Sequence, residues 1–486
     1  RALNMGPETI IGQIRPVITS AEINRAKHAK KSFAAAWDNQ FGSWEYQAVM
    51  NEEKGTEIIV DWADNTSVRM SAKQLYDVVF DGKNKWMLSA NGTIFTYEHE
   101  AIIPGLLKRW YSERQEMQRK MHECGDNEIE REYWDKRQLV KKINLNSLYG
   151  AILNPGCRFF DIRIGQSVTL TGRCITKHMG AKVNEIIAGK YDHKGESVVY
   201  GDTDSVYFSA HKTLSKEITA GQIPWTKDSV VELYDKIAEE VNTSFTNFMT
   251  KAFHCPSTRG SVIKAGRELV ASKGLFITKK RYAVLYYDVE GERVDVAGKP
   301  GKMKAMGLDL KRSDTPVFVQ DFLSEILMMV LQGKDEQEVL ERISSFREEF
   351  KSRPGWEKGS PKRANNMTKY TAAEEKAGRA NMPGHVRASM NWNRCREMYG
   401  DKYSMLITDG AKVIVCKLKN NPLGYTSIAY PVDEMRIPEW FKEMPFDGEA
   451  MEATILDQKI DNLIGVLDWD VQSTETSNTF NKLFEF

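Results

Sequence analysis

The sequence lacks several features that mark specialised classes of protein. No apolar run in its 486 residues approaches the roughly 20 residues that a helix needs to cross a bilayer, and no secretory signal pattern opens the chain. Neither sign of charge is in excess, because 68 basic and 67 acidic residues give a net charge of +1. We therefore expect a cytosolic protein without a membrane partner, in which any nucleic-acid surface is a local basic patch.

Cysteine is scarce and scattered. The six cysteines stand far apart and form none of the close pairs that bind zinc, so we expect reduced thiols and no zinc site. Internal repeats are also missing. With 41% hydrophobic residues, 34 glycines and 15 prolines, a chain of this length is expected to form a globular protein of about two to four domains.

A helical hairpin is predicted after a mixed N-terminal region. Residues 1–103 alternate short β-prone runs with turns, and Asn91-Gly92 is typical of a hairpin turn. Pro104-Gly105 opens a charged stretch with helical spacing, Gly125-Asp126-Asn127 interrupts it, and the spacing then resumes up to Gly150. We expect two antiparallel helices, the second ending at Gly150.

Two aspartates stand one residue apart between two β-prone runs. The stretch VYGDTDSVY (199–207) places Asp202 and Asp204 at the tip of an expected β-hairpin. Because residues i and i+2 of an extended backbone face the same side, both carboxylates could serve one metal site, and such hard oxygen ligands suit Mg²⁺ or Mn²⁺. Two ions about 4 Å apart can stabilise the attacking and leaving oxygens of a phosphoryl transfer. A solvated Asx turn and the Asp-x-Asp pair of metal-dependent glycosyltransferases remain alternatives.

The expected helical hairpin carries cations and an aromatic residue on shared faces. Lys142, Asn146 and Tyr149 are spaced i, i+4 and i+7, so they share one face that suits a triphosphate and a flat base. Arg114 lies in a basic stretch of the first helix, where phosphate is the expected ligand. A charged, solvent-exposed hairpin is the alternative.

Several motifs, in order, resemble those of family B DNA polymerases. They are KINLNSLYGA (142–151), YGDTDS (200–205) and TKKRY (278–282), which resemble the fingers, catalytic and primer-contacting motifs of that family. KGLFITKKRYAVLYYDVEG, KAMGLDLKRSDTP and the C-terminal tail resemble in particular the replicative polymerases of T-even-type bacteriophages. The resemblance extends over essentially the whole chain. It implies an α+β fold of the right-hand polymerase type, with an antiparallel-sheet palm, helical-hairpin fingers and a mostly helical thumb.

The resemblance also implies a domain order. Residues 1–103 correspond to a truncated N-terminal part of the palm, and residues 104–154 to the fingers. Residues 155–316 complete the palm with the catalytic hairpin and the primer-contact segment. The pattern becomes largely helical from Val317, and residues 317–486 correspond to a thumb with a clamp-binding tail.

Roles for individual residues follow from the same resemblance. Asp202 and Asp204 are expected in the catalytic cluster that binds two Mg²⁺ ions, with Asp204 the direct ligand and Mn²⁺ able to substitute. Arg114 and Lys142 are expected to hold the triphosphate of the incoming dNTP, and Asn146 and Tyr149 to line the nascent base pair. The residues expected to contact primer-template DNA are Lys279, Lys280, Arg281, Tyr282, Lys304, Lys311 and Arg312.

Two positions and the length of the fingers depart from the family pattern or match it loosely. The family often has a second basic residue one turn after the first-helix arginine, and here that position is Gln118, with Arg119 or another neighbour as the candidate substitute. The expected fingers are also shorter than those of the phage relatives. Glu268 matches an acid near the metal site, and a surface ion pair with Arg267 is the alternative.

The two ends of the chain carry further implications of the resemblance. The polar run before the terminus and the anchors Leu483, Phe484 and Phe486 imply a peptide that binds a sliding clamp, with a tail folded back on the thumb as the alternative. A third aspartate, in the family motif Asp-x-x-Ser-Leu-Tyr-Pro-Ser, is not found. The first residues resemble the stretch that follows it, so we expect either a partner N-terminal half with the exonuclease or an incomplete reading frame.

Through this resemblance, the sequence predicts a portion of a DNA-directed DNA polymerase that adds dNTPs to a primer 3′ end during replication. We expect it to act in the host cytoplasm if it is phage-encoded, and to need the upstream half for activity. The alternative function is a catalytically silent module that binds primer-template and a sliding clamp. A metal-dependent glycosyltransferase is a third hypothesis, although it would not need the basic helix or the primer-contact segment.

Overall fold

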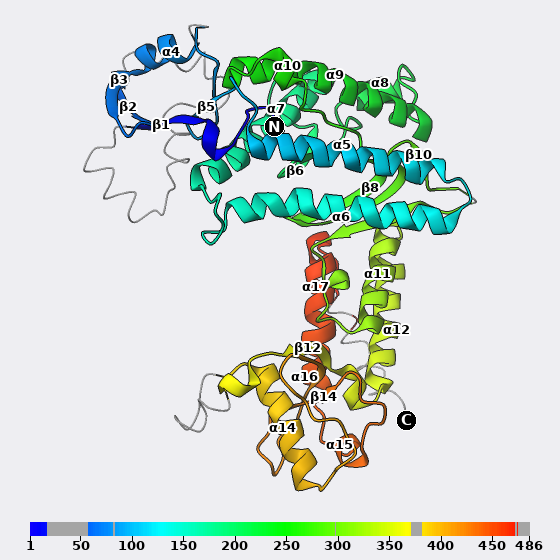
Figure 1. Cartoon of the computed structure of the whole chain (residues 1–486). Coiled ribbons are helices and arrows are strands. Elements are labelled where there is room, and N and C mark those ends of the chain that lie inside the picture. Colours follow the sequence, from blue (N-terminus) through cyan, green and yellow to red (C-terminus); the bar gives the residue numbers. More distant parts are fainter. Residues whose placement is uncertain (17–56, 81–82, 297, 371–381, 472–473, 475–486) are drawn as a thin grey trace. The chain divides into compact units, whose positions relative to one another are not determined.

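The computed structural model of the chain (Figure 1) describes residues 1–16, 57–80, 83–296, 298–370, 382–471 and 474. The chain forms two compact units, Arg1–Arg267 and Glu268–Phe486. Helices and antiparallel sheets occur in both, so the expected α+β class is confirmed. Among the described residues, no helix is both long and apolar enough to cross a membrane.

A five-stranded antiparallel sheet begins the N-terminal unit. Its order is β3-β2-β1-β5-β4, with bounds Ser67–Ser71, Glu57–Trp62, Ile10–Pro16, Thr93–Thr96 and Trp86–Leu88. The predicted Asn91-Gly92 turn joins β4 to β5, where Gly92 has a φ of +78°. A Cβ on Gly92 would also lie 3.2 Å from Ile14, a tight contact, so both conformation and space favour glycine there. The short helices η1 (Pro7–Thr9) and α4 (Ala72–Phe80) flank the strands.

The predicted helical hairpin is confirmed as α5 (Ile102–Glu123) and α6 (Glu128–Ile152), which lie side by side (Figure 1). The loop turns at Gly125, whose φ is +53°, and Asn127 caps α6 by accepting a hydrogen bond from the Glu130 N–H. Helix α5 starts two residues before Pro104, because a proline is tolerated in a first turn where no intrahelical donor is needed. The predicted end at Gly150 is wrong, since α6 continues to Ile152.

Two long helices pack against each other, and one of them also packs against a two-stranded sheet. Helix α7 (Ile162–Ala188) and helix α9 (Lys227–Phe253) pack against each other, and α7 also packs against both β6 (Val198–Asp202) and β7 (Ser205–Phe208). The N-terminal end of α7 shares an apolar cluster with the base of the helical hairpin. Helix α7 therefore connects the hairpin helices to the β6–β7 sheet. The short helices α8 (Ser215–Thr219) and α10 (Ser257–Gly260) complete the unit.

The C-terminal unit begins with a second antiparallel sheet. Strand β9 (Arg281–Val289) pairs with β8 (Leu269–Thr278) on one side and with β11 (Lys302–Met306) and β10 (Glu292–Arg293) on the other. Helices α11 (Val317–Gln332) and α12 (Glu336–Ser352) follow and form the main apolar core with the C-terminal helices. Those helices are α16 (Gly448–Glu452), the π-helical η4 (Ala453–Asp457), α17 (Gln458–Ile464) and η5 (Gly465–Leu467).

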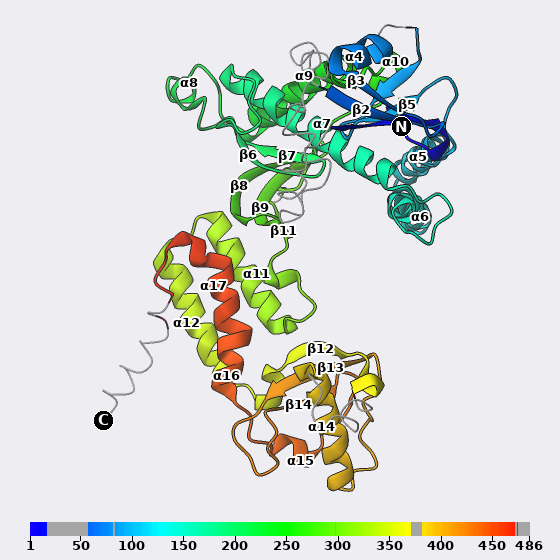
Figure 2. The ribbon, with the colours of Figure 1, turned by 90° about the vertical axis from the view of Figure 1, so that its left-hand side faces the viewer.

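A three-stranded sheet follows the two helices, in a region predicted only as largely helical. Strands β12 (Ser360–Ala364), β13 (Ala411–Lys417) and β14 (Ser427–Pro431) are antiparallel, and helix α14 (Gly384–Met398) lies against them (Figure 2). Trp392 of α14 is fully buried in this second core. The remaining short helices are η2 (Asp309–Lys311), η3 (Gly355–Lys358) and α15 (Glu439–Lys442).

Candidate functional site

The predicted β6–β7 hairpin is present, and its tip is a tight turn. Asp202 pairs with Ser205 at the end of the two strands, which leaves Thr203 and Asp204 outside the ladder. Thr203 has a φ of +51°, and the Asp204 N–H donates to the Asp202 carbonyl at 2.6 Å. The backbone at the tip is therefore not extended, and the turn rather than the strand pleat sets the relation between the two carboxylates.

Several hydrogen bonds hold the tip. The Thr203 hydroxyl donates to the Asp202 carboxylate at 3.1 Å, and the Ser205 hydroxyl donates to the Asp202 carbonyl at 3.2 Å. From helix α7, the Thr176 hydroxyl donates to the Thr203 carbonyl at 2.7 Å. Asp202 is half-buried and Asp204 is exposed, so the second carboxylate is open to a ligand from solvent.

The donor type at the tip fits a hard divalent cation, since carboxylate oxygens are the ligands that Mg²⁺ and Mn²⁺ prefer. The number of donors is smaller than such an ion requires. Within the described ranges, no group of three or more His, Cys, Asp or Glu side chains is arranged to hold a metal. Two carboxylates alone do not fill the coordination sphere of such an ion, so substrate, water or further protein groups would have to supply the remaining donors.

The predicted nucleotide-binding residues lie on the two hairpin helices. On α6, Lys142 and Asn146 are exposed and Tyr149 is half-buried, one to two turns apart on one face. On α5, Arg114 is half-buried and its Nε donates to the Gln138 side chain of α6 at 3.1 Å. Arg114 therefore contacts the partner helix, while Lys142 presents its ammonium group to solvent.

Arg119 is engaged elsewhere and is a poor substitute for a basic residue at Gln118. Its guanidinium forms ion pairs with Glu116 at 2.7 Å and with Glu123 at 2.6 Å, and the hydrogen bond that it donates to Glu116 raises the pKa of Arg119. Lys141 likewise forms an ion pair with Glu113 across the two helices.

The structure divides the TKKRY segment into two pairs of residues. Lys279 and Lys280 form the exposed turn between β8 and β9, and Lys280 has a φ of +64°. Arg281 instead donates to the Asn462 carbonyl at 3.1 Å, and Tyr282 is 8% exposed. The two lysines are exposed to solvent, whereas Arg281 and Tyr282 contribute contacts inside the C-terminal unit. Arg281 also lies 3.6 Å from Asp309, and Tyr282 stacks on Phe276.

Ion pairs also occupy most of the remaining predicted DNA contacts. Lys304 pairs with Glu268 at 2.7 Å, and Arg312 pairs with Asp314 at 3.0 Å, whereas Lys311 is exposed. Glu268 thus forms a surface ion pair, as the alternative reading expects, and its partner is Lys304. Arg267 instead donates to Asp235 of α9 at 2.5 Å.

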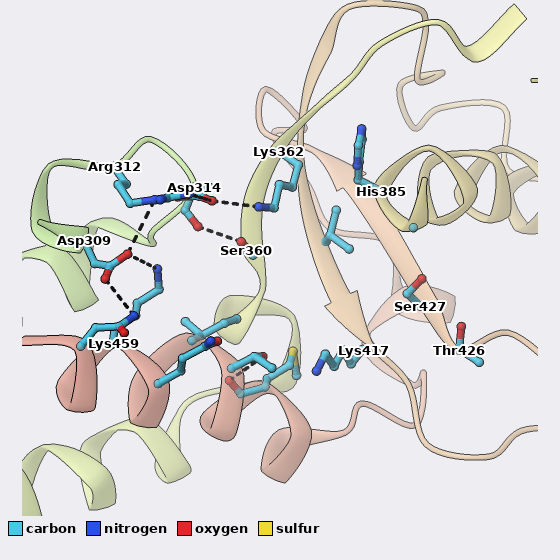
Figure 3. A pocket seen from close by; sticks show the side chains of 17 residues that line it. Asp309, Arg312, Asp314, Ser360, Lys362, His385, Lys417, Thr426, Ser427 and Lys459 are labelled. Carbon is cyan, nitrogen blue, oxygen red and sulfur yellow. Dashed lines mark hydrogen bonds and ion pairs between the residues drawn. The ribbon is translucent and has the colours of Figure 1, made fainter. Parts of the chain in front are cut away.

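A polar cleft of about 700 Å³ in the C-terminal unit contains cations that the motifs did not single out (Figure 3). Lys362 approaches Asp314 at 3.0 Å, and hydrogen bonds from Arg312 and Lys362 hold the pKa of Asp314 well below its usual range. Lys417 and Lys459 also line the cleft, which lies among β12, β13 and α17. These residues come from distant parts of the sequence, so no local motif could have identified the cluster.

The predicted clamp-binding anchors Leu483, Phe484 and Phe486 lie outside the described residues. The described chain before them ends in a buried contact, because the Arg347 Nε of α12 donates to the Thr474 hydroxyl at 3.0 Å. Arg347 is 2% exposed and also forms ion pairs with Glu452 and Asp457. This network anchors Thr474 to helix α12.

Comparison with known proteins identifies the family. A family model described as DNA polymerase family B matches residues 57–358. The chain is 31% identical over 306 residues to the DNA-directed DNA polymerase of Escherichia phage RB69, and 29% identical over 309 residues to that of Enterobacteria phage T4. Each match covers 60% of this chain and 33% of the relative.

A more distant relative is the DNA polymerase delta catalytic subunit of Oryza sativa, 28% identical over 238 residues that cover 49% of this chain and 18% of the relative. The chain thus spans about a third of the length of the phage relatives that it matches. The family model covers more than half of the chain and includes the helical hairpin, the Asp202–Asp204 turn and the β8–β9 hairpin. The chain belongs to DNA polymerase family B.

Proposed function

We propose that this chain is the palm, fingers and thumb portion of a DNA-templated DNA polymerase that adds dNTPs to a primer 3′ end. Residues 1–103 and 155–316 would form the palm, 104–154 the fingers and 317–486 the thumb. The observation that carries the proposal is the Asp202-Thr203-Asp204 turn, which presents an exposed carboxylate in a chain of this family. The exposed Lys142 and the Lys279-Lys280 turn support it.

The two aspartates are proposed to hold the divalent metal site. Mg²⁺, or Mn²⁺ in its place, would supply Lewis-acid stabilisation of the charge that develops on the transferred phosphoryl group and its leaving pyrophosphate. The chain's own contribution is the rigid turn that fixes Asp204 beside Asp202. Catalysis of this kind depends mainly on positioning and electrostatics, so a small displacement of either carboxylate is expected to be costly.

The helical hairpin is proposed to bind the incoming dNTP. Lys142 offers an exposed ammonium to the triphosphate, and Arg114 offers a guanidinium that the contact with Gln138 orients. Asn146 and Tyr149 follow Lys142 on the same face of α6, where an amide and an aromatic ring can contact the nascent base pair.

Primer-template DNA is proposed to be held by exposed cations of the C-terminal unit. Lys279, Lys280 and Lys311 are exposed, and Lys362 and Lys417 line the polar cleft. Lysine contacts with phosphate position a duplex without reading its sequence. Lys304, Arg312 and Lys362 can join these contacts only by exchanging a carboxylate partner for a phosphate, which reduces their net contribution.

A complete catalytic cluster needs a further carboxylate, which we propose comes from an N-terminal polymerase half that also carries an exonuclease. The partial donor set of the described chain supports this proposal. The terminal residues Leu483, Phe484 and Phe486 are proposed to bind a sliding clamp. The same partial donor set favours a second candidate function for the chain by itself, a catalytically silent module that binds primer-template and the clamp.

Primer extension with Mg²⁺ on a primed DNA template tests the proposal. The chain is assayed alone, with an upstream fragment that carries the family's third aspartate, and with that fragment but with Asp204→Ala in the chain. Incorporation that needs both parts and is lost in the variant is the expected result. DNA binding without incorporation in any mixture would select the silent module, and incorporation by the chain alone would refute the need for a further carboxylate.

A further inference from the structure

Thr203, at the centre of the turn, adopts a backbone conformation that its side chain disfavours. Its φ is +51°, in the left-handed region, where a β-branched residue is rarely found. Such a conformation persists only when neighbouring groups over-determine it, and it then marks a position where geometry matters for function. The groups that hold Thr203 therefore also determine where the residues on either side of it point.

The peptide unit between Thr203 and Asp204 is held at both of its polar groups. Its N–H, which belongs to Asp204, donates to the Asp202 carbonyl at 2.6 Å. Its C=O, which belongs to Thr203, accepts the Thr176 hydroxyl at 2.7 Å. Because the peptide unit is planar, holding these two groups also restricts the position of the Asp204 Cα, from which its carboxylate extends.

Thr176 brings this hydrogen bond from outside the hairpin. It is half-buried on α7, its hydroxyl also lies 3.1 Å from the Gly172 carbonyl of the same helix, and α7 packs against both strands. A threonine in a helix can bond its own helix backbone alone, as Thr169 does. Thr176 additionally contacts the one peptide unit that separates the two aspartates.

We propose that Thr176 is a positioning residue for the metal site, which holds the Thr203–Asp204 peptide so that the Asp202 and Asp204 carboxylates converge on one divalent cation. This inference rests on the proposed function, in which those two aspartates bind the metal. It assigns to α7 a direct part in shaping the site, although Thr176 itself is not proposed to touch the metal or the substrate.

Three variants separate this role from packing. Thr176→Val keeps the volume of the side chain and removes the hydroxyl, whereas Thr176→Ser keeps the hydroxyl and removes a methyl group. Thr169→Val is the matched control, because its hydroxyl bonds to the Gly165 and Gln166 carbonyls of α7. Asp204→Ala reports whether the measured cation binds at the turn at all.

The measurement is Mn²⁺ binding, followed by electron paramagnetic resonance of the free ion, on the full chain together with the upstream fragment and primed DNA. We expect Thr176→Val to weaken binding by about tenfold or more, as a displacement of roughly 1 Å at a preorganised site does. Thr176→Ser and Thr169→Val are expected to bind like wild type. The Mn²⁺ concentration that half-activates incorporation should change in parallel, while primer-template affinity stays constant.

Each other outcome has a defined meaning. Wild-type Mn²⁺ affinity in Thr176→Val, or a loss that Thr176→Ser does not restore, would overturn the positioning role. Undiminished binding in Asp204→Ala would instead overturn the proposed function, because the cation would then lie elsewhere. If Thr176→Val fails to fold, Thr176→Ala is compared by the same binding measurement, and unchanged affinity in that variant also refutes the inference.

Discussion

Asn242 of helix α9 holds both backbone polar groups of Ala265, accepting from its N–H at 2.8 Å and donating to its C=O at 2.7 Å. Two turns earlier on the same helix, Asp235 accepts hydrogen bonds from Arg267. These contacts tie the last residues of the N-terminal unit to α9, just before the boundary between Arg267 and Glu268. The chain therefore leaves the N-terminal unit from a fixed point.

Asn242→Ala should loosen this segment. It removes two hydrogen bonds to the backbone, a loss of about 1–3 kcal/mol, so local opening increases by about tenfold for each 1.4 kcal/mol. Lys264 is exposed, and trypsin cleavage after it reports the opening. Asn247→Ala, at an exposed position of α9, is the control and should be cleaved at the wild-type rate. Equal cleavage of the two variants would show that the Asn242–Ala265 hydrogen bonds do not hold the segment around Lys264.

His178 is expected to make the free energy of unfolding fall in mild acid. Burial, followed by the charge of Lys182, lowers the pKa of His178 to about 4 from 6.5. Its ring nitrogens bond to Tyr191 and Ser244, and its ring stacks on Phe248 at 4.0 Å. Because the folded pKa is depressed, the stabilisation is complete above pH 6.5 and is lost as pH falls towards 4, on the order of 2–3 kcal/mol.

Urea unfolding at pH 7 and at pH 4 measures this loss. The nearby Glu185 raises the pKa of His178, whereas burial and Lys182 lower it, and the value of about 4 includes all three effects. His178→Gln keeps hydrogen-bonding capacity without the titration, so it should lose less stability than wild type between the two pH values. The same pH dependence in both proteins would rule out His178 as the cause.

Lys142→Ala should impair use of the incoming dNTP. Loss of a charge-assisted contact worth about 1.5–3 kcal/mol is expected to raise the KM for dNTP by about 10- to 100-fold, with unchanged primer-template affinity. Steady-state incorporation by the chain with its upstream fragment measures the effect. Lys136→Ala, on another face of α6 where Lys136 pairs with Glu132 at 2.7 Å, is the control. An equal change in both variants would contradict a specific role for Lys142.

Substitutions in the TKKRY segment should have two different effects, one on DNA binding and the other on stability. Lys279→Ala and Lys280→Ala should each lower the slope of log affinity for primed DNA against log salt by about 0.9, with wild-type stability. Arg281→Ala should instead reduce stability, because the Asn462 carbonyl loses its hydrogen bond from Arg281 and Asp309 loses one of the cations around it. Salt titrations and thermal melts distinguish the two effects. A stable Arg281→Ala variant with weakened DNA binding would assign Arg281 to the DNA-contacting group.

Local patterns predicted the parts of the site that are built from neighbouring residues. The Asp202–Asp204 hairpin follows from a Gly-Asp-Thr-Asp stretch between β-prone runs, and the helical hairpin follows from its periodicity and the break at Gly125. Tertiary contacts were not predictable in the same way. The partners of Arg281 lie at Asp309 and Asn462, and nothing near Arg281 in the sequence indicates that its charge is used internally.

The shape of the turn and the polar cleft also depend on tertiary contacts that local sequence patterns do not predict. The sequence pattern predicts an extended backbone between the aspartates, but Thr203 adopts a φ of +51°. This conformation depends on contacts that include Thr176, which lies 27 residues away. The cleft cations Lys362 and Lys417 stand on adjacent strands of a sheet that the largely helical pattern did not reveal. Short strands separated by polar loops give weak periodic signals, so packing rather than pattern defines them.

Metal-directed cleavage tests most directly whether the turn holds the catalytic cation. Fe²⁺ replaces Mg²⁺ in the complex of the chain with its upstream fragment, primed DNA and a dNTP, and ascorbate with peroxide then cuts the backbone next to the bound ion. We predict that the chain is cut within β6–β7 around Asp202 and Asp204, and that Asp204→Ala abolishes the cut. Cleavage confined to other segments, or unchanged in Asp204→Ala, would contradict the assignment of this turn as the metal site.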